Sequence, residues 1–396
     1  MDLKSILGSI KPKTLLIALG STLGVVLIVV VAMLLFRVND DVTDVLSEID
    51  PLENIALDDE ELDSEEEIQD EEEYEDEPAE QTPRAILTGL PIYEESNQRP
   101  LAFVINNIRR ALPQSGIASA DIIYEVLAEG DVTRLVAIFQ SYIPDMIGPI
   151  RSTRDYFVDF AFNHDAIFIH HGGSISGYAR VRNTGIDSLD GMNLEGSVFW
   201  RDRTYPDWHW NSGVRPLEHS SYAGWQNTSG NSNIKSHIES NSIRNYINDD
   251  PAFVFSFGEV PEGIASTFTA NEIRVPFSNG YVRTFIFDEE NGVYLVENRD
   301  GEHDDATTRE QVAVGNILIQ LTSIRVIDNE GRREVGTVGS GSGFLIREGE
   351  VFNVTWAKSS ISSPMSWYFE SGDNIVLTPG RTWINVFQET GEVVFE

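Results

Sequence analysis

One uninterrupted apolar segment near the N-terminus constrains this chain more than any other feature. Residues 15–36 contain no charged side chain in 22 positions, which is enough for a helix to cross the roughly 30 Å hydrocarbon core of a bilayer. Lys4, Lys11 and Lys13 precede this segment, and acidic residues follow it. Because flanking positive charge stays on the cytoplasmic side, the pattern predicts a cytoplasmic N-terminus (1–14), a single-pass signal anchor (15–36) and an extracytoplasmic remainder.

A cleaved signal peptide is the alternative interpretation of the same segment. Such peptides have an apolar region of about 7 to 15 residues followed by a small-residue cleavage site. The segment here is longer, and Arg37, Val38 and Asn39 directly after it offer no such site. The anchor is therefore the favoured prediction.

A strongly acidic run follows the apolar segment. Residues 40–80 contain 22 Asp and Glu and no Lys or Arg, and a segment of this kind cannot bury enough apolar surface to offset the chain entropy lost on folding. We expect a disordered linker over residues 37–83, with a cation- or partner-binding tail as the alternative. Even from residue 81 on, 41 acidic side chains face 24 basic ones, which disfavours general binding to nucleic acid.

The chain contains no cysteine, which excludes a disulfide framework, a thiolate metal site, a cysteine nucleophile and a lipid-modified N-terminal cysteine. Standard spacings for a nucleophile elbow, a zinc-protease helix, a phosphate loop and a dinucleotide fingerprint are also missing. We therefore expect no cofactor.

The folded region shows two different sequence patterns, which predict two domains. Residues 84–230 alternate short apolar runs with helical patterns and glycine-rich turns, whereas residues 251–396 consist of short aromatic or β-branched runs bounded by Gly, Asn and Asp. The expected fold is therefore a mixed α/β (α+β) N-terminal domain and an all-β C-terminal domain, a sandwich or a barrel, behind one transmembrane helix. Residues 231–250 are the predicted linker, with a short helix near residues 234–246.

Local patterns in the first domain predict individual elements. Strands are expected at residues 101–105, 122–127, 133–139 and 166–170, the second and third forming a hairpin. Ser152, followed three residues later by Asp155 and then by apolar residues at helical spacing, has the form of a capping box, so a helix is predicted to start at Ser152. A second helix is expected after the Gly172-Gly173-Ser174 turn, ending near Arg182.

In the second domain, strands are expected at residues 317–321, 344–347, 352–356, 366–369, 374–377 and 382–387. The run Gly339 to Gly343 looks like a phosphate loop only superficially, because it lacks the lysine and the following helix. A flexible turn or bulge is the favoured interpretation of this run.

The candidate ligand-binding residues gather around the two predicted helix starts. A helix N-terminus presents unpaired N–H groups and attracts anions, and paired guanidiniums can fork onto a carboxylate or phosphate. The predicted anion site comprises Arg151, Ser152, Arg154, His170, Gly172, Gly173 and Ser174. The alternative is that the two arginines form ion pairs with nearby acids and only stabilise the domain.

Long stretches of the sequence resemble the YerB-like lipoprotein family of Gram-positive bacteria, a two-domain family of unknown function. The resemblance rests on GPIRSTRDYFVDFA and HDAIFIHHGGS in the first half, and on GSGFLIREGEVFNVTWAK and LTPGRTWINVF in the second. The resemblance implies an extracytoplasmic location, but it implies no particular reaction. The family's usual anchor is an acylated cysteine, for which this chain substitutes an apolar segment.

The leading functional hypothesis is a membrane-anchored binding module for an anionic cell-envelope ligand or a partner protein. The alternative is an envelope hydrolase acting on a phosphate, acyl or glycan substrate, with His170 and Glu125 as candidate catalytic groups. A metal site combining His170, His171 and Asp165 with His219 or Glu125 is a further alternative, and no metal is predicted. Aromatic residues between positions 199 and 225 could stack on a sugar, although a loop packing its own aromatics is favoured.

Overall fold

The computed structural model describes residues 82–93, 96–226, 233–248 and 255–396. The predicted anchor at residues 15–36 and nearly all of the acidic linker lie outside the described residues. No helix within the described ranges is long and apolar enough to cross a membrane. From residue 78 onward the chain belongs to one compact unit.

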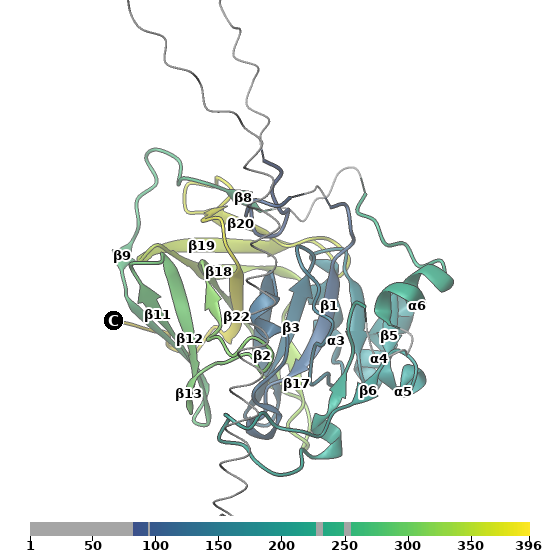
Figure 1. The fold of residues 1–396 in the computed structure, drawn as a ribbon. Coiled ribbons are helices and arrows are strands. Elements are labelled where there is room, and N and C mark those ends of the chain that lie inside the picture. Colours follow the sequence, from purple (N-terminus) through teal and green to yellow (C-terminus); the bar gives the residue numbers. More distant parts are fainter. Residues whose placement is uncertain (1–81, 94–95, 227–232, 249–254) are drawn as a thin grey trace, which may run out of the picture. The chain divides into compact units, whose positions relative to one another are not determined.

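A single sheet of eleven strands runs through this unit and includes strands from both halves of the sequence (Figure 1). Its strands, in spatial order, are β20 (Ser366–Phe369), β19 (Glu350–Lys358), β18 (Gly339–Arg347), β15 (Asn316–Thr322), β22 (Thr382–Gln388), β2 (Ile122–Glu129), β3 (Val132–Phe139), β1 (Leu101–Asn106), β4 (Ile167–His170) and β5 (Ser188–Asp190), with β9 (Phe268–Thr269) paired to β19. The predicted strands of both halves are therefore present, and residues 84–230 and 251–396 share hydrogen-bonded structure.

The N-terminal half is mixed α/β, as expected. Strands β2 and β3 form the predicted antiparallel hairpin, while β1, β4 and β5 run parallel to one another. The helices of the described residues are α3 (Asp155–Phe162), α4 (Ile175–Thr184), α5 (Gly191–Leu194) and α6 (Ile234–Ser240), with 3₁₀ turns η1 (Arg109–Ala111), η2 (Ile117–Ser119) and η3 (Leu217–His219).

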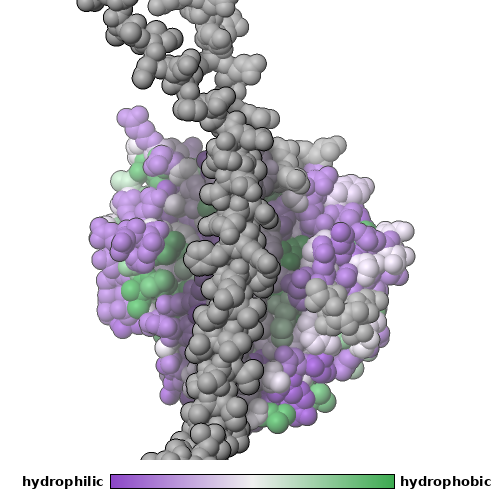
Figure 2. All heavy atoms as spheres, in the orientation of Figure 1, coloured by the Kyte–Doolittle hydropathy of each residue, from purple (hydrophilic) through white to green (hydrophobic). Residues whose placement is uncertain are grey.

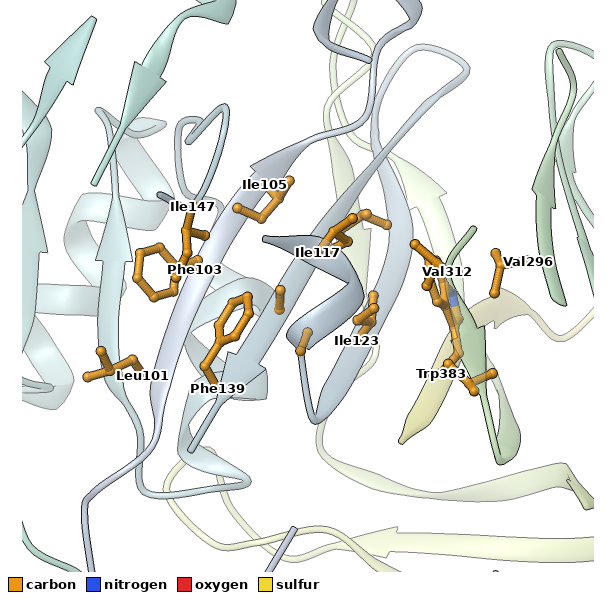
Figure 3. Packing of buried hydrophobic residues seen from close by; sticks show 14 of the residues in the cluster. Leu101, Phe103, Ile105, Ile117, Ile123, Phe139, Ile147, Val296, Val312 and Trp383 are labelled. Atoms are coloured by element: carbon orange, nitrogen blue, oxygen red, sulfur yellow. The ribbon is translucent and has the colours of Figure 1, made fainter. Parts of the chain in front are cut away.

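The two faces of the large sheet have separate apolar cores, because side chains of a strand alternate between faces. On the face that we call face A, Phe103 and Phe139 meet edge to face with ring centroids 5.4 Å apart (Figure 3). On the opposite face, face B, helix α3 covers the sheet, and Phe160 stacks on Tyr124 at 4.8 Å.

The C-terminal half is β-rich and divides its strands between two sheets. The second sheet has the order β13 (Gly301–Glu302), β12 (Val293–Asn298), β11 (Tyr281–Asp288), β10 (Glu272–Ser278) and β23 (Val394–Phe395), with β14 (Ala313–Val314) paired to β12. It packs on face A, where Phe285 contacts Trp383 and Phe277 contacts Phe387. Figure 3 shows Trp383 beside Val296 of β12 and beside Val312, which directly precedes β14.

Three two-stranded pairs complete the described elements. They are β6 (Trp200–Arg201) with β7 (Ser221–Tyr222), β8 (Ser256–Phe257) with β21 (Val376–Leu377), and β16 (Ile324–Val326) with β17 (Arg333–Val335). On the side of the molecule in Figure 2, the described surface is mostly hydrophilic, with small separate hydrophobic areas.

The prediction that a helix starts at Ser152 is wrong, because α3 begins at Asp155. Ser152 and Thr153 have other partners: the Ser152 hydroxyl donates to the carbonyl of His171, and Thr153 bridges to Gly173 as an isolated β pair. This extension of the sheet holds the segment in an extended conformation. The expected helix after the Gly-Gly turn is confirmed, with Ser174 as its N-cap.

The interpretation of residues 339–343 as a flexible turn is also wrong, because this run forms the first part of β18 and pairs with β19. The glycines are needed for packing. A Cβ on Gly343 would lie 2.3 Å from the carbonyl oxygen of Ile319, and one on Gly341 would lie 2.7 Å from Nε1 of Trp356.

Candidate functional site

The carboxyl ends of the parallel strands β4 and β5 bring together His170, Asp190 and the start of α4. Ligands of open α/β sheets bind at such ends. Asp190 accepts hydrogen bonds from the backbone N–H of Gly172 at 2.9 Å and from the hydroxyl of Tyr178 at 2.9 Å. Although burial opposes ionisation, hydrogen bonds from the Gly172 and Met192 backbones lower the pKa of Asp190. The residue is thus an anionic anchor for the glycine turn.

His170 is buried beside this anchor. Its Nδ1 lies 2.8 Å from the carbonyl oxygen of Gly172 and 3.7 Å from a carboxylate oxygen of Asp190. Because a carbonyl only accepts, Nδ1 carries the proton and Nε2 is an acceptor. Among the described residues Nε2 has no hydrogen-bond partner, and burial lowers the pKa of the imidazole. His170 is therefore neutral, with its acceptor nitrogen buried.

The next residue, His171, points to the other side of the strand end. Its Nδ1 lies 2.8 Å from the Ser221 hydroxyl, and its Nε2 lies 3.0 Å from Nη2 of Arg201. Since a guanidinium only donates, Nε2 is the acceptor and His171 is neutral. Burial and Arg201 together lower the pKa of His171. Arg201 is in turn held by both carboxylate oxygens of Glu195, at 2.9 and 2.7 Å.

Arg151 differs from its neighbours because its guanidinium has no hydrogen bond or ion pair within the described residues. Its backbone is fixed by hydrogen bonds to Val104 and His171, and its side chain is half-buried. Burial lowers the pKa of Arg151, the nearby Glu218 raises it and Arg201 lowers it further. This half-buried guanidinium is therefore close to both an acidic side chain, Glu218, and a second guanidinium, that of Arg201.

Arg154 and Arg134 share one acid on face B. Glu129 pairs with the guanidinium of Arg154 and, at 2.7 Å, with that of Arg134. Arg134 also donates to the carbonyl of Ser152. Burial and the charge of Arg151 lower the pKa of Arg134 to about 10. The structure thus separates the roles of the two predicted clamp arginines: Arg154 is ion-paired and Arg151 is not.

The remaining predicted ligand residues form the backbone frame of this region. Ser174 caps α4 by accepting from the N–H of Gly177 at 3.0 Å. Gly172 has a positive φ of 78°, a conformation that favours glycine. A Cβ on Gly173 would lie 2.8 Å from Thr153. These glycines let the turn pack tightly against the segment that carries Arg151.

Glu125 lies elsewhere, in a buried network between the two sheets. Its carboxylate receives hydrogen bonds from Arg283 at 2.7 and 3.2 Å, from Asn107 at 3.1 Å and from Thr133 at 2.8 Å. Arg283 also lies over the ring of Trp383 at 4.8 Å. Four donors occupy most of the lone pairs of Glu125, as expected of an ion-paired acceptor rather than of a proton-abstracting base.

Glu125 and His170 do not form one site. Glu125 has the same strand parity as Ile123, a face A residue, whereas His170 has the parity of Phe168, a face B residue. Strands β3 and β1 also lie between β2 and β4, which at about 4.8 Å a strand separates the two backbones by on the order of 14 Å. A mechanism that needs both side chains at one bond is incompatible with this arrangement.

The residues considered for a metal site have separate partners. Asp165 pairs with Arg99 and Arg244, His219 lies 2.8 Å from the amide of Asn106, and His171 contacts Ser221. Within the described ranges, no group of three or more His, Asp or Glu side chains could hold a metal ion.

The aromatic segment packs largely against its own domain. Trp200 stacks on Tyr222 at 6.4 Å, Tyr205 lies under Arg215 at 4.6 Å, and Trp210 lies under Arg109 at 4.5 Å. Trp210 is half exposed. The arginines thus occupy ring faces that a sugar would need.

Sequence reasoning missed Asp190, Arg201, Arg283 and His303. A signal existed for one of them: in the strand YVRTFIFD, Arg283 has the inward parity of Phe285, just as Glu125 has the inward parity of Ile123. Opposite charges at core positions of two strands indicate a buried ion pair. No comparable pattern marks Asp190 or Arg201.

Fold and sites together define a two-part protein, one part mixed α/β and one β-rich, joined through a shared sheet. Family models described as the N-terminal and C-terminal domains of a protein of unknown function (DUF3048) match residues 87–236 and 273–384. The chain belongs to this YerB-like DUF3048 family, which confirms the resemblance seen in the sequence.

Two comparisons with individual proteins support the family assignment. The "Putative lipoprotein YerB" of Bacillus subtilis (strain 168) is 32% identical over 312 residues, which span 76% of this chain and 86% of that protein. The crystal structure of YerB protein from Bacillus subtilis superposes with a TM-score of 0.65 at 31% identity, covering 76% of this chain and 96% of that one.

Proposed function

We propose that this protein is held at the outer side of the cell membrane and binds an anionic envelope ligand through the surface around Arg151. The binding surface comprises Arg151, with Arg201 and His219 as its cationic or polar neighbours and the Gly172–Ser174 turn as its frame. The observation that carries the proposal is the half-buried guanidinium of Arg151, which makes no hydrogen bond or ion pair within the described residues and has the exposed Glu218 as its nearby acid.

An unpaired, partly desolvated guanidinium is costly, and the neighbouring positive charges raise that cost. The charge of Arg201 lowers the pKa of Arg151. The charge of Arg151 in turn lowers the pKa of Arg134 and that of His219. Glu218, the acid near it, is exposed. A carboxylate or phosphate placed here would relieve this repulsion and gain charge-assisted hydrogen bonds.

The position in the fold supports the same conclusion. Arg151 and His171 are hydrogen-bonded neighbours at the carboxyl end of β4, next to the N-terminus of the ten-residue helix α4. Loops at the carboxyl ends of parallel strands are the usual ligand sites of α/β folds. Arg154, which was included in the predicted clamp, takes a structural role through Glu129.

Membrane attachment is proposed through residues 15–36 acting as a single-pass anchor. The support comes from the length of the apolar segment and from the lysines on its N-terminal side. The relative from Bacillus subtilis carries the description lipoprotein. An apolar anchor would hold this chain at the outer side of the membrane without a lipid-modified cysteine.

The hydrolase alternative is less well supported. It requires a base and an acid near one bond, whereas Glu125 is paired with Arg283 on face A and His170 lies on face B. Binding needs only the guanidinium and its frame.

Arg151→Ala tests the proposal. We expect retention of the full chain on purified cell-wall glycan to fall about tenfold, the effect of losing one charge-assisted hydrogen bond. The exposed Arg325→Ala is the matched control and should bind normally. Removing the phosphate groups from the glycan should abolish the difference. Equal retention of both variants and the wild type would refute the role of Arg151.

A further inference from the structure

A cavity lies between strand β2 and strand β11 of the second sheet. It has a volume of about 330 Å³, within the range of about 300 to 1,000 Å³ typical of small-molecule sites. Its lining comes from η1, β2, β11 and the turn after β12, and consists of Asn107, Arg109, Leu112, Glu125, Gly280, Tyr281, Val282, Arg283, Asn298, Arg299 and Asp300. None of these residues belongs to the Arg151 surface.

The floor of this cavity is a buried hydrogen-bond network with a fixed direction. Arg283 donates to Nδ1 of His303, so Nε2 of His303 carries the proton and donates to Gln114. Gln114 donates to Asn107, and Asn107 donates to Glu125. A continuous network of this kind fixes the carboxylate of Glu125 and the guanidinium of Arg283 before any ligand arrives, which lowers the cost of binding.

The charges that line the cavity do not cancel. Glu125 pairs with Arg283, and Asp300 pairs with Arg109 at 3.0 Å. Arg299 is exposed at the rim, and its guanidinium has no hydrogen bond or ion pair within the described chain. The lining therefore has one spare positive charge in an acidic protein and no spare carboxylate for an ammonium group.

The lining also offers hydrogen-bonding groups suited to hydroxyls. Oε2 of Glu125 receives one hydrogen bond, from Nε of Arg283, and keeps a lone pair for a further donor. The side-chain oxygen of Asn298 accepts from the backbone of Asp300, which leaves its N–H₂ group for a ligand oxygen. Half-buried Tyr281 adds one ring surface.

We propose that this cavity binds an anionic sugar unit, a single pyranose that carries one carboxylate or one phosphate. Arg299 pairs with the anionic group, and Glu125 and Asn298 bind ring hydroxyls. The spare positive charge excludes an amino sugar with a free ammonium, and the volume excludes a longer oligosaccharide from the cavity itself. This site is independent of the surface around Arg151.

The test uses the full chain in a sugar-free detergent and isothermal titration calorimetry with four sugar probes, and with acetate as an anion that lacks the ring. Glucuronate, glucose 6-phosphate, glucose and glucosamine share one ring and differ in charge. We expect saturable binding of glucuronate or glucose 6-phosphate, at least tenfold weaker binding of glucose, and none of glucosamine. The stronger of the two anionic probes identifies the anion as a carboxylate or a phosphate.

Variants assign the binding to this cavity. Arg299→Ala should weaken the binding of the anionic probe about tenfold. Because Arg299 is exposed and unpaired within the described chain, the variant should be as stable to unfolding as the wild type. Arg325→Ala and Arg151→Ala should bind the probe normally, so failure of the Arg151 proposal leaves this one intact. The proposal is overturned if neither anionic sugar binds, if acetate binds as tightly as glucuronate, or if Arg299→Ala binds the probe like the wild type.

Discussion

Glu125 of β2 and Arg283 of β11 form a bidentate ion pair that joins the two sheets, and each side chain is only 2% exposed. The pair lies 158 positions apart in the sequence. It connects the α/β half to the β-rich half at the floor of the cavity. Its partners His303, Gln114 and Asn107 extend the connection without leaving a polar group of the pair unsatisfied.

Breaking this pair should destabilise the fold. Arg283→Met leaves a buried carboxylate without its counter-ion, and such losses cost about 3 to 5 kcal/mol. The double variant Glu125→Leu with Arg283→Met should recover much of that loss, because both buried charges are gone. Urea unfolding of the two variants provides the measurement, and a double variant no more stable than the single one would contradict the account.

Removing Arg154 should affect stability without affecting ligand binding. Its guanidinium pairs with Glu129 and donates to Thr153, so Arg154→Ala leaves a half-buried carboxylate with Arg134 alone. We expect a loss of about 1 to 3 kcal/mol. Arg151→Ala, whose guanidinium has no partner, should lose less than about 0.5 kcal/mol. Thermal unfolding measures the loss of stability in each variant. Equal losses would show that Arg151 also stabilises the fold.

Lys358 should give the protein a pH-dependent stability. Burial lowers the pKa of its ammonium group from 10.5 to about 8, with Asp159 acting in the opposite direction. The unfolded chain therefore binds this proton more tightly, so the free energy of unfolding should rise as the pH increases from about 8 to 10. The rise amounts to about 2 kcal/mol.

Lys358→Met is the control for that effect, because it removes the titrating group while filling similar space. The variant should lack the rise between pH 8 and 10 in a series of denaturant titrations. The same slope in variant and wild type would show that another group is responsible.

Gly343 in β18 should not tolerate a side chain. A Cβ there would lie 2.3 Å from the carbonyl oxygen of Ile319 on the paired strand, so Gly343→Ala should cost about 1 to 3 kcal/mol through forced strand displacement. Gly280→Ala is the matched control, since its nearest neighbour would be 4.0 Å away. Chemical denaturation should show normal stability for the control, and a normal Gly343→Ala variant would refute the packing role.

Much of the local structure followed from the sequence. The β2–β3 hairpin and the strand before the double glycine were predicted because apolar runs end at clear turn residues. The helix predicted after the Gly172-Gly173-Ser174 turn is also present, with Ser174 as its N-cap. The cap at Ser152 failed, although its pattern was equally good, because the residue hydrogen-bonds to His171 across the sheet instead.

The candidate site was predicted only in part. Arg151 and the glycine turn do lie together at the end of β4, although the helix start that was predicted beside Arg151 is absent. Two outcomes depend on which face of the sheet each side chain occupies. Arg154 pairs with Glu129 and so differs from Arg151, and Glu125 lies on the opposite face from His170. A strand sequence gives the alternation of faces but not which neighbouring element covers each one.

The sequence by itself determined the apolar N-terminal segment, the acidic run, the positions of most strands of the eleven-stranded sheet and the family. These features depend on composition and on interactions between residues close in the chain. Only the tertiary structure decided that β2 pairs with β22, that Glu125 meets Arg283 and that Arg151 remains unpaired. Those outcomes depend on contacts between residues far apart in the chain, whose free energies arise only when the two halves pack together.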